Sequence, residues 1–313
     1  MLNNSPSVLS VSVVTMRRYT NIDGSLPHTA SAVFKWAVMD RLAGRRAPNR
    51  QPFEAPHVFN DGATLRSNVS DVLATWIGHA TWLVQLAGVN MLVDPIWART
   101  ISGFIRRRSA PGVALGDMPR VDIVLVTHNH RDHMDSPTLR HFANAPMAVV
   151  PMGLGPALGR LGYREVKELD WWQTLRAGEV SITFVPSQHW SRRGLTDTNA
   201  TLWGGYVLEG GGKRVYHTGD TAYFDGFRDI AWRIGSPDAA LVPIGAYEPE
   251  WFMRKEHMNP EDALMAASDL DARRILPMHW GTYQLSDEWP GEPPQKLVEL
   301  ADSEQRLLER LTL

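Results

Sequence analysis

One short stretch of the chain gathers side chains that bind metals. The segment THNHRDHMD, residues 127–135, holds three of the 11 histidines in the 313-residue sequence, together with two aspartates. Imidazoles and carboxylates this close together repel one another or compete for solvent unless a cation lies between them, and divalent metals take both groups as ligands. The run H-x-H-x-D-H therefore predicts a metal site formed by His128, His130, Asp132 and His133.

The spacing within this run indicates more than one ion. His128, His130 and Asp132 lie two residues apart, so an extended or turning backbone can direct them to the same side. Asp132 and His133 are adjacent and must point differently. One ion cannot readily take all four side chains, whereas two neighbouring ions can share them. We therefore expect two divalent metal ions, with zinc favoured by the ligand types and manganese or iron as alternatives.

Four predicted strands run directly into residues that can bind a metal. The carboxyl ends of strands in layered α/β domains converge on one edge, where ligands usually bind. We therefore expect these residues to form a single site from distant parts of the chain. They are His128 after residues 122–127, His189 after 182–188, Asp220 after 214–219 and His279 after 274–278.

Composition excludes several kinds of chemistry. The chain is 43% hydrophobic and 21% charged, which is ordinary for a globular protein. A formal net charge of −2 provides no basic field that would recruit nucleic acid. There is no cysteine, so disulfides, thiolate zinc sites and cysteine nucleophiles are all excluded, and any metal must be held by histidine, aspartate and glutamate.

Hydropathy bears on where the protein works. No apolar run approaches the ~20 residues needed to span a bilayer. The N-terminal segment has no lysine or arginine before Arg17 and makes a poor signal peptide. We expect a cytoplasmic protein, with Met16 as an alternative start that would make residues 1–15 an extension.

Residues 1–70 differ in pattern from the rest of the chain. They lack clear periodicity apart from a predicted helix over Ala32–Leu42, and we interpret them as an N-terminal arm. From Leu73 onward, short runs of β-forming residues alternate with helical patterns, and the break at Gly88–Asn90 predicts a hairpin. This order favours a layered α/β domain. Helices are expected over 136–143 with Ser136 as the cap, over 259–270 with Asn259 as the cap, and over 293–313.

Several motifs together resemble the metallo-β-lactamase-fold hydrolases. HNHRDH matches the H-x-H-x-D-H signature of that group, and the resemblance extends over roughly residues 70–290 through GHATWLVQLAGVNMLVDPIW, PSQHWSRRG, HTGDTAYF, PIGAYEPEWFM, HMNPEDA and PMHWGTY. These segments look like the branch containing N-acylphosphatidylethanolamine-hydrolysing phospholipase D and its bacterial relatives. A lactonase that acts on ascorbate 6-phosphate is more distantly similar. The resemblance implies a four-layer αββα sandwich over residues 71–313, with residues 1–70 as an N-terminal extension.

The resemblance also implies roles for individual residues. Asp94 would orient a ligand histidine, and His79 and His257 would lie near the substrate. Asp132 would carry a proton towards the leaving group, with His257 as its rival for that role. The implied ligands are His128, His130 and His189 for the first ion, Asp132, His133 and His279 for the second, and Asp220 bridging both.

A metal site of this kind predicts direct hydrolysis. Two ions that share a water molecule make a bridging hydroxide available as the nucleophile, so no covalent enzyme intermediate is needed. The nearest resemblance favours a phosphodiester, including that of a phospholipid headgroup. A lactone or β-lactam hydrolase with the same metal site is one alternative. A metal-dependent binding protein without catalysis is the other, although all seven ligand positions carry competent ligand types.

Other residues are candidates for substrate or membrane contact. Arg192 and Arg193 lie just after His189 and could supply cations for an anionic substrate, and Trp251 could line an apolar pocket. A peripheral membrane contact is expected around Phe34 and Trp36 if the substrate is a lipid. Ordinary surface or packing roles are expected for Arg106–Arg108, Trp171, Trp172, His28, His57 and His141.

Overall fold

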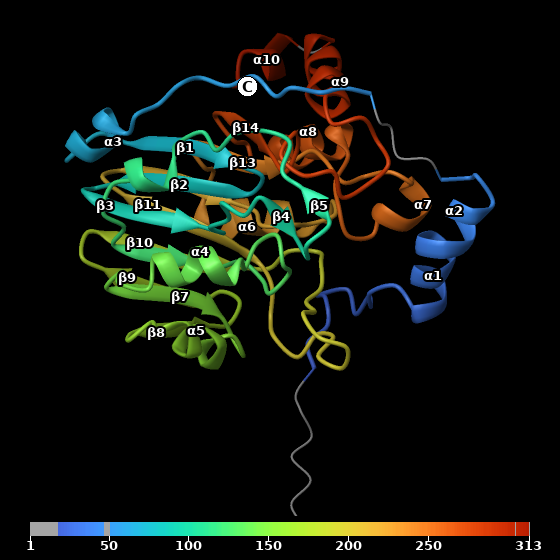
Figure 1. The fold of residues 1–313 in the computed structure, drawn as a ribbon. Coiled ribbons are helices and arrows are strands. Elements are labelled where there is room, and N and C mark those ends of the chain that lie inside the picture. Colours follow the sequence, from blue (N-terminus) through green and yellow to red (C-terminus); the bar gives the residue numbers. More distant parts are fainter. Residues whose placement is uncertain (1–17, 47–50, 304, 313) are drawn as a thin grey trace, which may run out of the picture.

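Two six-stranded sheets form the centre of the structure (Figure 1). The computed structural model describes residues 18–46, 51–303 and 305–312, so Met16 lies outside the described residues. The first sheet has the order β1 (Leu73–Gly78), β2 (Thr81–Leu86), β3 (Val89–Val93), β6 (Ile123–Leu125), β7 (Met147–Pro151) and β8 (Val166–Leu169). The second has the order β14 (Ile275–Met278), β13 (Ala239–Pro243), β12 (Lys213–His217), β11 (Gly205–Gly210), β10 (Val180–Val185) and β9 (Thr174–Ala177).

Each sheet combines antiparallel and parallel pairing. In the first sheet, β1, β2 and β3 pair antiparallel, and β3, β6, β7 and β8 pair parallel. In the second, β9 to β12 pair antiparallel and β12, β13 and β14 pair parallel. A separate two-stranded ribbon joins β4 (Thr100–Ile101) to β5 (Ile105–Arg106). The parallel strands matter for function, because the residues that follow them emerge at one edge of the sandwich.

Helices cover the outer faces of both sheets. Packed on the first sheet are α3 (Ala63–Ser67), α4 (Ser136–His141) and α5 (Gly155–Leu161), and on the second α6 (Gly226–Ile234), α8 (Pro260–Asp269) and α9 (Glu292–Asp302). The shorter elements are α7 (Glu250–Met253), α10 (Gln305–Leu308) and the 3-10 turn η2 (Leu115–Asp117). The layers follow the order helix, sheet, sheet, helix, which confirms the expected αββα sandwich.

Alternation along the strands builds these layers. In β2, Trp82 and Val84 face the core between the two sheets, and Leu83 faces the helices of the first sheet. In β10, Phe184 faces the core between the sheets and Val185 packs under the helices of the second sheet. A strand covered on both faces reads as a nearly continuous apolar run, which explains the patterns TWLVQL and VSITFV.

Turns and caps mostly follow the sequence signals. The predicted hairpin joins β2 to β3, and Ala87 and Gly88 at its tip both have positive φ, as a type I′ turn requires. The Asn259 side chain caps α8 by accepting from Asp262 N at 2.8 Å, as expected. The expected cap at Ser136 is wrong by one residue. The cap of α4 is Asp135, whose side chain accepts from Thr138 N at 3.1 Å.

The C-terminal helix predicted over 293–313 is divided in the structure. Helix α9 ends at Asp302 and α10 spans Gln305–Leu308. Beyond α10, Leu311 pairs with Ile275 in parallel, and Thr312 N donates to Ile275 O at 3.0 Å. The end of the chain is therefore extended because it satisfies backbone groups of β14, which a helix to the last residue could not do.

The predicted N-terminal helix is present as one helical stretch. It consists of α1 (Ala30–Phe34), a π-helical turn η1 (Lys35–Met39) and α2 (Asp40–Leu42), and it lies next to α7 in Figure 1. Trp36 is half-buried: its ring stacks on Phe252 with centroids 4.6 Å apart, and the Arg46 guanidinium lies 3.9 Å from its centroid. No helix in the described parts of the chain is long and apolar enough to cross a membrane.

The buried face of β10 provides a test of the sandwich core. Phe184 is fully buried between the sheets, whereas Phe59 is 82% exposed. We expect Phe184→Ala to lower the free energy of unfolding by about 3–5 kcal/mol, because it removes transfer energy and leaves a cavity. Phe59→Ala, the matched control, should change it by less than about 0.5 kcal/mol. Denaturant titration measures both, and equal losses would contradict this packing.

Candidate metal centre

Side chains from both sheets meet at the edge where the parallel strands end. The structure brings together all seven predicted metal ligands, and His79 and His257 join them. Four groups of their ligand atoms can be drawn, and within each group the atoms lie no more than 4.8 Å apart. His28, His57 and His141 belong to none of these groups, as expected from the sequence.

The first group contains three imidazoles. His128 Nε2 lies 2.8 Å and His189 Nε2 lies 3.2 Å from the same atom, His130 Nδ1. A single proton on His130 can serve only one of these two neighbours, so a neutral triad leaves nitrogen lone pairs facing each other. A cation coordinated by all three nitrogens removes that conflict, and three imidazoles suit zinc.

The second group adds a carboxylate to two imidazoles. Asp132 Oδ2 lies 3.5 Å from His133 Nε2 and 3.6 Å from His279 Nε2. It also lies 3.0 Å from His79 Nε2, which is the expected distance for a hydrogen bond. These contacts allow Asp132, His133 and His279 to hold one ion while His79 forms a hydrogen bond with the carboxylate of Asp132.

Asp220 lies between the two groups. Its Oδ2 is 3.0 Å from His133 Nε2, 3.3 Å from His279 Nε2 and 3.9 Å from His189 Nε2. The carboxylate is only 3% exposed. It therefore occupies the position expected of a ligand shared by two ions.

The donor atoms that face the centre fit a metal better than they fit one another. His133 Nε2 and His279 Nε2 lie at ion-pair distance from Asp220 Oδ2 without an aligned hydrogen bond, and Asp220 Oδ1 is buried with no hydrogen-bond partner among the described residues. Buried polar atoms without partners are rare and costly, so their convergence at one point is an argument for a bound cation.

Carboxylates control the protonation of two of the ligands. Burial alone would lower the pKa of His133, but the carboxylates of Asp220, Asp132 and Asp94 raise it well above its ordinary value. Burial also opposes the charge on His279, yet Asp220 and Asp132 raise its pKa to about 9. In the metal-free protein these two imidazoles therefore carry protons at neutral pH.

The imidazoles of the first group behave in the opposite way. Burial lowers the pKa of His130 to about 4 and holds the pKa values of His128 and His189 well below the ordinary range. Neutral imidazole is the form that binds metals. This half of the centre is therefore prepared for an ion without losing protons.

Asp94 holds His133, one of the predicted ligands, by a hydrogen bond. Its Oδ2 accepts from His133 Nδ1 at 2.7 Å and from Thr127 Oγ1 at 2.6 Å, and its Oδ1 accepts from Thr127 N at 2.7 Å. The Thr127 hydroxyl lies 3.0 Å from His128 Nδ1 as well. One buried carboxylate thus fixes the ring of His133 and, through Thr127, the start of the H-x-H-x-D-H loop.

Backbone strain is concentrated at this centre. His79, Asp94 and His279 all have positive φ, at 56°, 45° and 63°. Non-glycine residues rarely adopt this region, and they persist there only when the surrounding structure holds them. The holding contacts include His279 N, which donates to His79 O at 3.0 Å, and His79 N, which donates to Thr282 Oγ1 at 2.7 Å.

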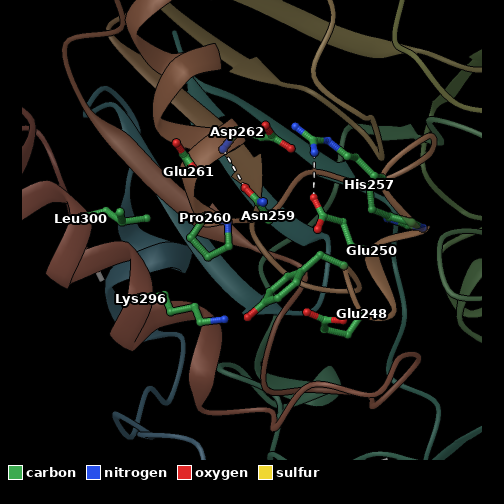
Figure 2. Close-up of a pocket in the computed structure, with 11 residues that line it drawn as sticks. Glu248, Glu250, His257, Asn259, Pro260, Glu261, Asp262, Lys296 and Leu300 are labelled. Atoms are coloured by element: carbon green, nitrogen blue, oxygen red, sulfur yellow. Dashed lines mark hydrogen bonds and ion pairs between the residues drawn. The ribbon is translucent and has the colours of Figure 1, made fainter. Parts of the chain in front are cut away.

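His257 borders both the centre and a separate cavity. Its Nδ1 lies 3.9 Å from Asp220 Oδ2 and has no hydrogen-bond partner in the described structure, and burial lowers its pKa to about 4. The cavity, of about 240 Å³, is lined mainly by polar residues of α7, α8 and α9 and of the segments that flank α7. Figure 2 shows the imidazole of His257 at the margin of this group, directed away from Lys296 and Leu300.

The two arginines after His189 differ in their contacts. Arg193 Nη1 donates to Met134 O at 2.9 Å and to Asn129 O at 3.3 Å, and its Nη2 donates to Ser136 Oγ at 3.0 Å. Its guanidinium therefore fixes the loop that carries His130 and Asp132. Among the described residues, Arg192 donates through Nε alone, to Gly194 O at 2.9 Å, and its charge lies close enough to lower the pKa of His130.

Trp251, Trp171 and Trp172 lie outside the metal centre. Trp251 is 46% exposed and packs against the N-terminal arm, where the Lys35 ammonium lies 3.9 Å from its ring centroid. Trp171 donates from Nε1 to Trp203 O at 2.7 Å, and Arg233 lies over the ring of Trp172. The packing roles expected for Trp171 and Trp172 agree with these contacts.

Two contributors to the site were missed in the sequence. Glu256 O lies 2.9 Å from His189 Nδ1 and accepts a hydrogen bond from it, and Asn21 Oδ1 accepts from His189 N at 3.1 Å. Glu256 precedes His257 in the motif EHMNP, which was a usable signal. Asn21 had none, because the arm around it lacks periodicity.

Comparisons with known proteins point in one direction. The family described as "Beta-lactamase superfamily domain" matches residues 89–280. N-acyl-phosphatidylethanolamine-hydrolyzing phospholipase D 1 of Caenorhabditis elegans is 38% identical over 256 residues, covering 76% of this chain and 72% of the relative. The mitochondrial N-acyl-phosphatidylethanolamine-hydrolyzing phospholipase D of Saccharomyces cerevisiae is 36% identical over 245 residues, covering 74% of this chain and 52% of the relative.

Solved structures share the fold at lower identity. Igni18, a metallo hydrolase from Ignicoccus hospitalis KIN4/I, aligns with a TM-score of 0.57 and 24% identity over 77% of this chain and 93% of its own. CmlA, a diiron beta-hydroxylase from Streptomyces venezuelae, aligns with a TM-score of 0.55 and 24% identity over 76% of this chain and 52% of its own. At this identity the likeness establishes the fold alone.

Metal uptake should release protons. His133 and His279 are protonated in the metal-free protein near pH 7, because their pKa values are raised, and both must be neutral to bind a metal. We expect loading of the chelator-treated protein at pH 7 to release roughly two protons per chain. Calorimetric zinc titrations in buffers of different ionisation enthalpy measure that number. Zinc binding without proton release would contradict this protonation pattern.

Proposed function

Because the chain belongs to the beta-lactamase superfamily and is a metal-dependent hydrolase, we propose that it hydrolyses phosphodiester bonds, with a phospholipid as the substrate. The observation that supports this most strongly is the 38% identity to a relative named as a phospholipase D, over 76% of this chain. All seven predicted ligands lie within residues 89–280, the part of the chain that matches the family.

The proposed centre is dinuclear. His128, His130 and His189 would hold one ion, and Asp132, His133 and His279 the other, with Asp220 between them. Such ions, when bound, would lower the pKa of a water molecule and would neutralise charge on phosphoryl oxygens. Zinc is the ion that this ligand set suits best, with manganese or iron as alternatives.

The chain's own residues divide the remaining tasks. Asp132 is held by His79 and faces two ligand imidazoles, so its pKa stays well below the ordinary value against the effect of burial. A carboxylate fixed in this way positions ligands better than it carries protons. His257 Nδ1 is neutral and has no partner among the described residues, and we propose that it accepts or returns the proton exchanged with the leaving group.

Arg192 is the proposed contact for the anionic part of the substrate. Its terminal guanidinium nitrogens have no partner within the described chain, and it follows His189 by three residues. Arginine forms paired hydrogen bonds with phosphate oxygens. Arg193 is a less direct candidate for this contact, because its guanidinium already donates hydrogen bonds to the loop that carries His130 and Asp132.

We propose that the N-terminal helix makes a peripheral membrane contact. Phe34, Val38 and Leu42 are 56%, 38% and 84% exposed, and their spacing of four residues places them on one face of the helix. Exposed apolar stripes of this kind dock at lipid surfaces. Trp36, also expected to take part, is stacked on Phe252 instead.

Substrate screening tests the reaction. Bis-p-nitrophenyl phosphate, a phospholipid, a lactone and a β-lactam are assayed side by side on the zinc-loaded protein. We expect the two phosphodiesters to react fastest. Asp220→Ala should bind neither ion, and its activity should fall by more than the ~10–100-fold typical of removing a residue that only orients a metal ligand. His141→Ala should keep both ions and its activity. Faster turnover of the lactone or β-lactam would replace the phosphodiester with that substrate class.

Vesicle sedimentation tests the membrane contact. The triple variant Phe34→Ser, Val38→Ser, Leu42→Ser should sediment several-fold less with phosphatidylethanolamine–phosphatidylcholine vesicles, because it removes apolar surface that would enter the interface. Trp232→Ser is the control, since Trp232 is 82% exposed on α6, away from this helix. Equal sedimentation of the native chain and the triple variant would rule the contact out.

A further inference from the structure

We propose that Asn21, in the N-terminal arm, is a positioning residue for the metal ligand His189, so that the arm forms part of the first metal site. The inference rests on the proposed metal centre and extends it to a segment that no metal motif reaches. Its basis is a closed set of hydrogen bonds between residues 19–25 and the loop that carries His189.

Asn21 is buried, and both polar atoms of its side chain form hydrogen bonds. Its side chain is 6% exposed. The Oδ1 atom accepts from His189 N at 3.1 Å and from Trp203 Nε1 at 3.0 Å, and Nδ2 donates to Ser25 Oγ at 3.1 Å. Removing this carbonyl would leave His189 N, a buried donor, without a partner.

The contacts around Asn21 hold the arm to the same loop. Gln188 Nε2 donates to Asp23 Oδ2 and to Ser25 Oγ, both at 2.8 Å. Tyr19 N donates to Asn199 O at 2.9 Å, and Asn199 Nδ2 donates back to Tyr19 O at 3.0 Å. The arm is therefore fixed on both sides of Asn21, and the position of its carbonyl is well determined.

His189 and His128, two ligands of the same group, are anchored in different ways. His128 directly follows Thr127, which Asp94 holds by two hydrogen bonds. His189 lies in a loop beyond the end of β10 (Val180–Val185). In that loop Gln188 N donates to Thr221 Oγ1 at 3.0 Å, which leaves the amide of His189 itself to Asn21.

The ring and the main chain of His189 are held from different directions. Glu256 O accepts from Nδ1 and fixes the ring, so that Nε2 faces His130 Nδ1. Asn21 holds the main-chain N of His189, next to the anchor that Ala222 N provides by donating to Gln188 O at 2.9 Å. Loss of one anchor lets the ring pivot about the other, and groups that orient a ligand histidine typically contribute 10–100-fold to metal affinity.

The test compares variants of Asn21 by metal binding alone. Asn21→Leu removes both acceptor contacts at similar volume. Asn21→Asp keeps the acceptor towards His189 N and Trp203 Nε1. Asn21→Ser shortens the side chain and gives the same reading if Asn21→Leu does not fold. The control is Asn90→Leu, since Asn90 hydrogen-bonds Gln85 and Arg120 on the far side of β3 and contacts none of the proposed ligands.

The probe is Co²⁺, titrated into the full-length, chelator-treated protein and followed by visible absorption. His189→Ala and His279→Ala provide reference spectra for loss of the first and of the second site. We expect Asn21→Leu to weaken the first site by roughly 10-fold or more while the second binds as in the native chain. Asn21→Asp should retain native affinity, and Asn90→Leu should lower the unfolding temperature without changing either site.

The outcomes separate this inference from the proposed function. Native cobalt affinity in Asn21→Leu or Asn21→Ser would overturn it, as would equal weakening of both sites. A native chain that binds cobalt but hydrolyses no phosphodiester would refute the proposed reaction only, since the cobalt readout does not depend on turnover. A native chain that binds no Co²⁺ would overturn both.

Discussion

The structure depends on how one buried carboxylate is compensated. Asp220 is 3% exposed and lies within 4 Å of imidazole nitrogens from His133, His189, His257 and His279. A buried charge is tolerated only when opposite charge and hydrogen bonds surround it. The histidines supply part of that compensation as imidazolium, and metal ions can supply the rest. The strands, loops and outer partners of the site can be understood as means of bringing these cationic groups to a single oxygen.

Local signals allowed much of this centre to be predicted. The ligands follow strands, and strand ends converge, so His128, His189, Asp220 and His279 could be placed together from sequence. The same reasoning located most strands. It missed the short strands β4, β5, β8 and β9, and the segments VKEL and TLRA of the last two are partly charged.

Contacts between segments far apart in the sequence could not be predicted. Nothing in the sequence around Asn21 predicts that its carbonyl meets the amide of His189. Likewise, adjacent arginines look alike in sequence, yet Arg193 holds loop carbonyls whereas Arg192 does not. Such distinctions depend on where the backbone runs in three dimensions, which residue type and spacing do not encode locally. The cap of α4 shows the same limit on a smaller scale, because Ser136 and Asp135 are both good capping residues.

The division of the ligands between the two halves of the sandwich has a thermodynamic consequence. His128, His130, Asp132 and His133 follow strands of the first sheet, and His189, Asp220 and His279 follow strands of the second. Each proposed ion would therefore fasten one half of the molecule to the other. Binding energy of this kind adds to the cohesion between the halves. The free concentration of the ion would then be a variable in the folding equilibrium, and loss of the ions would weaken the cohesion between the two halves.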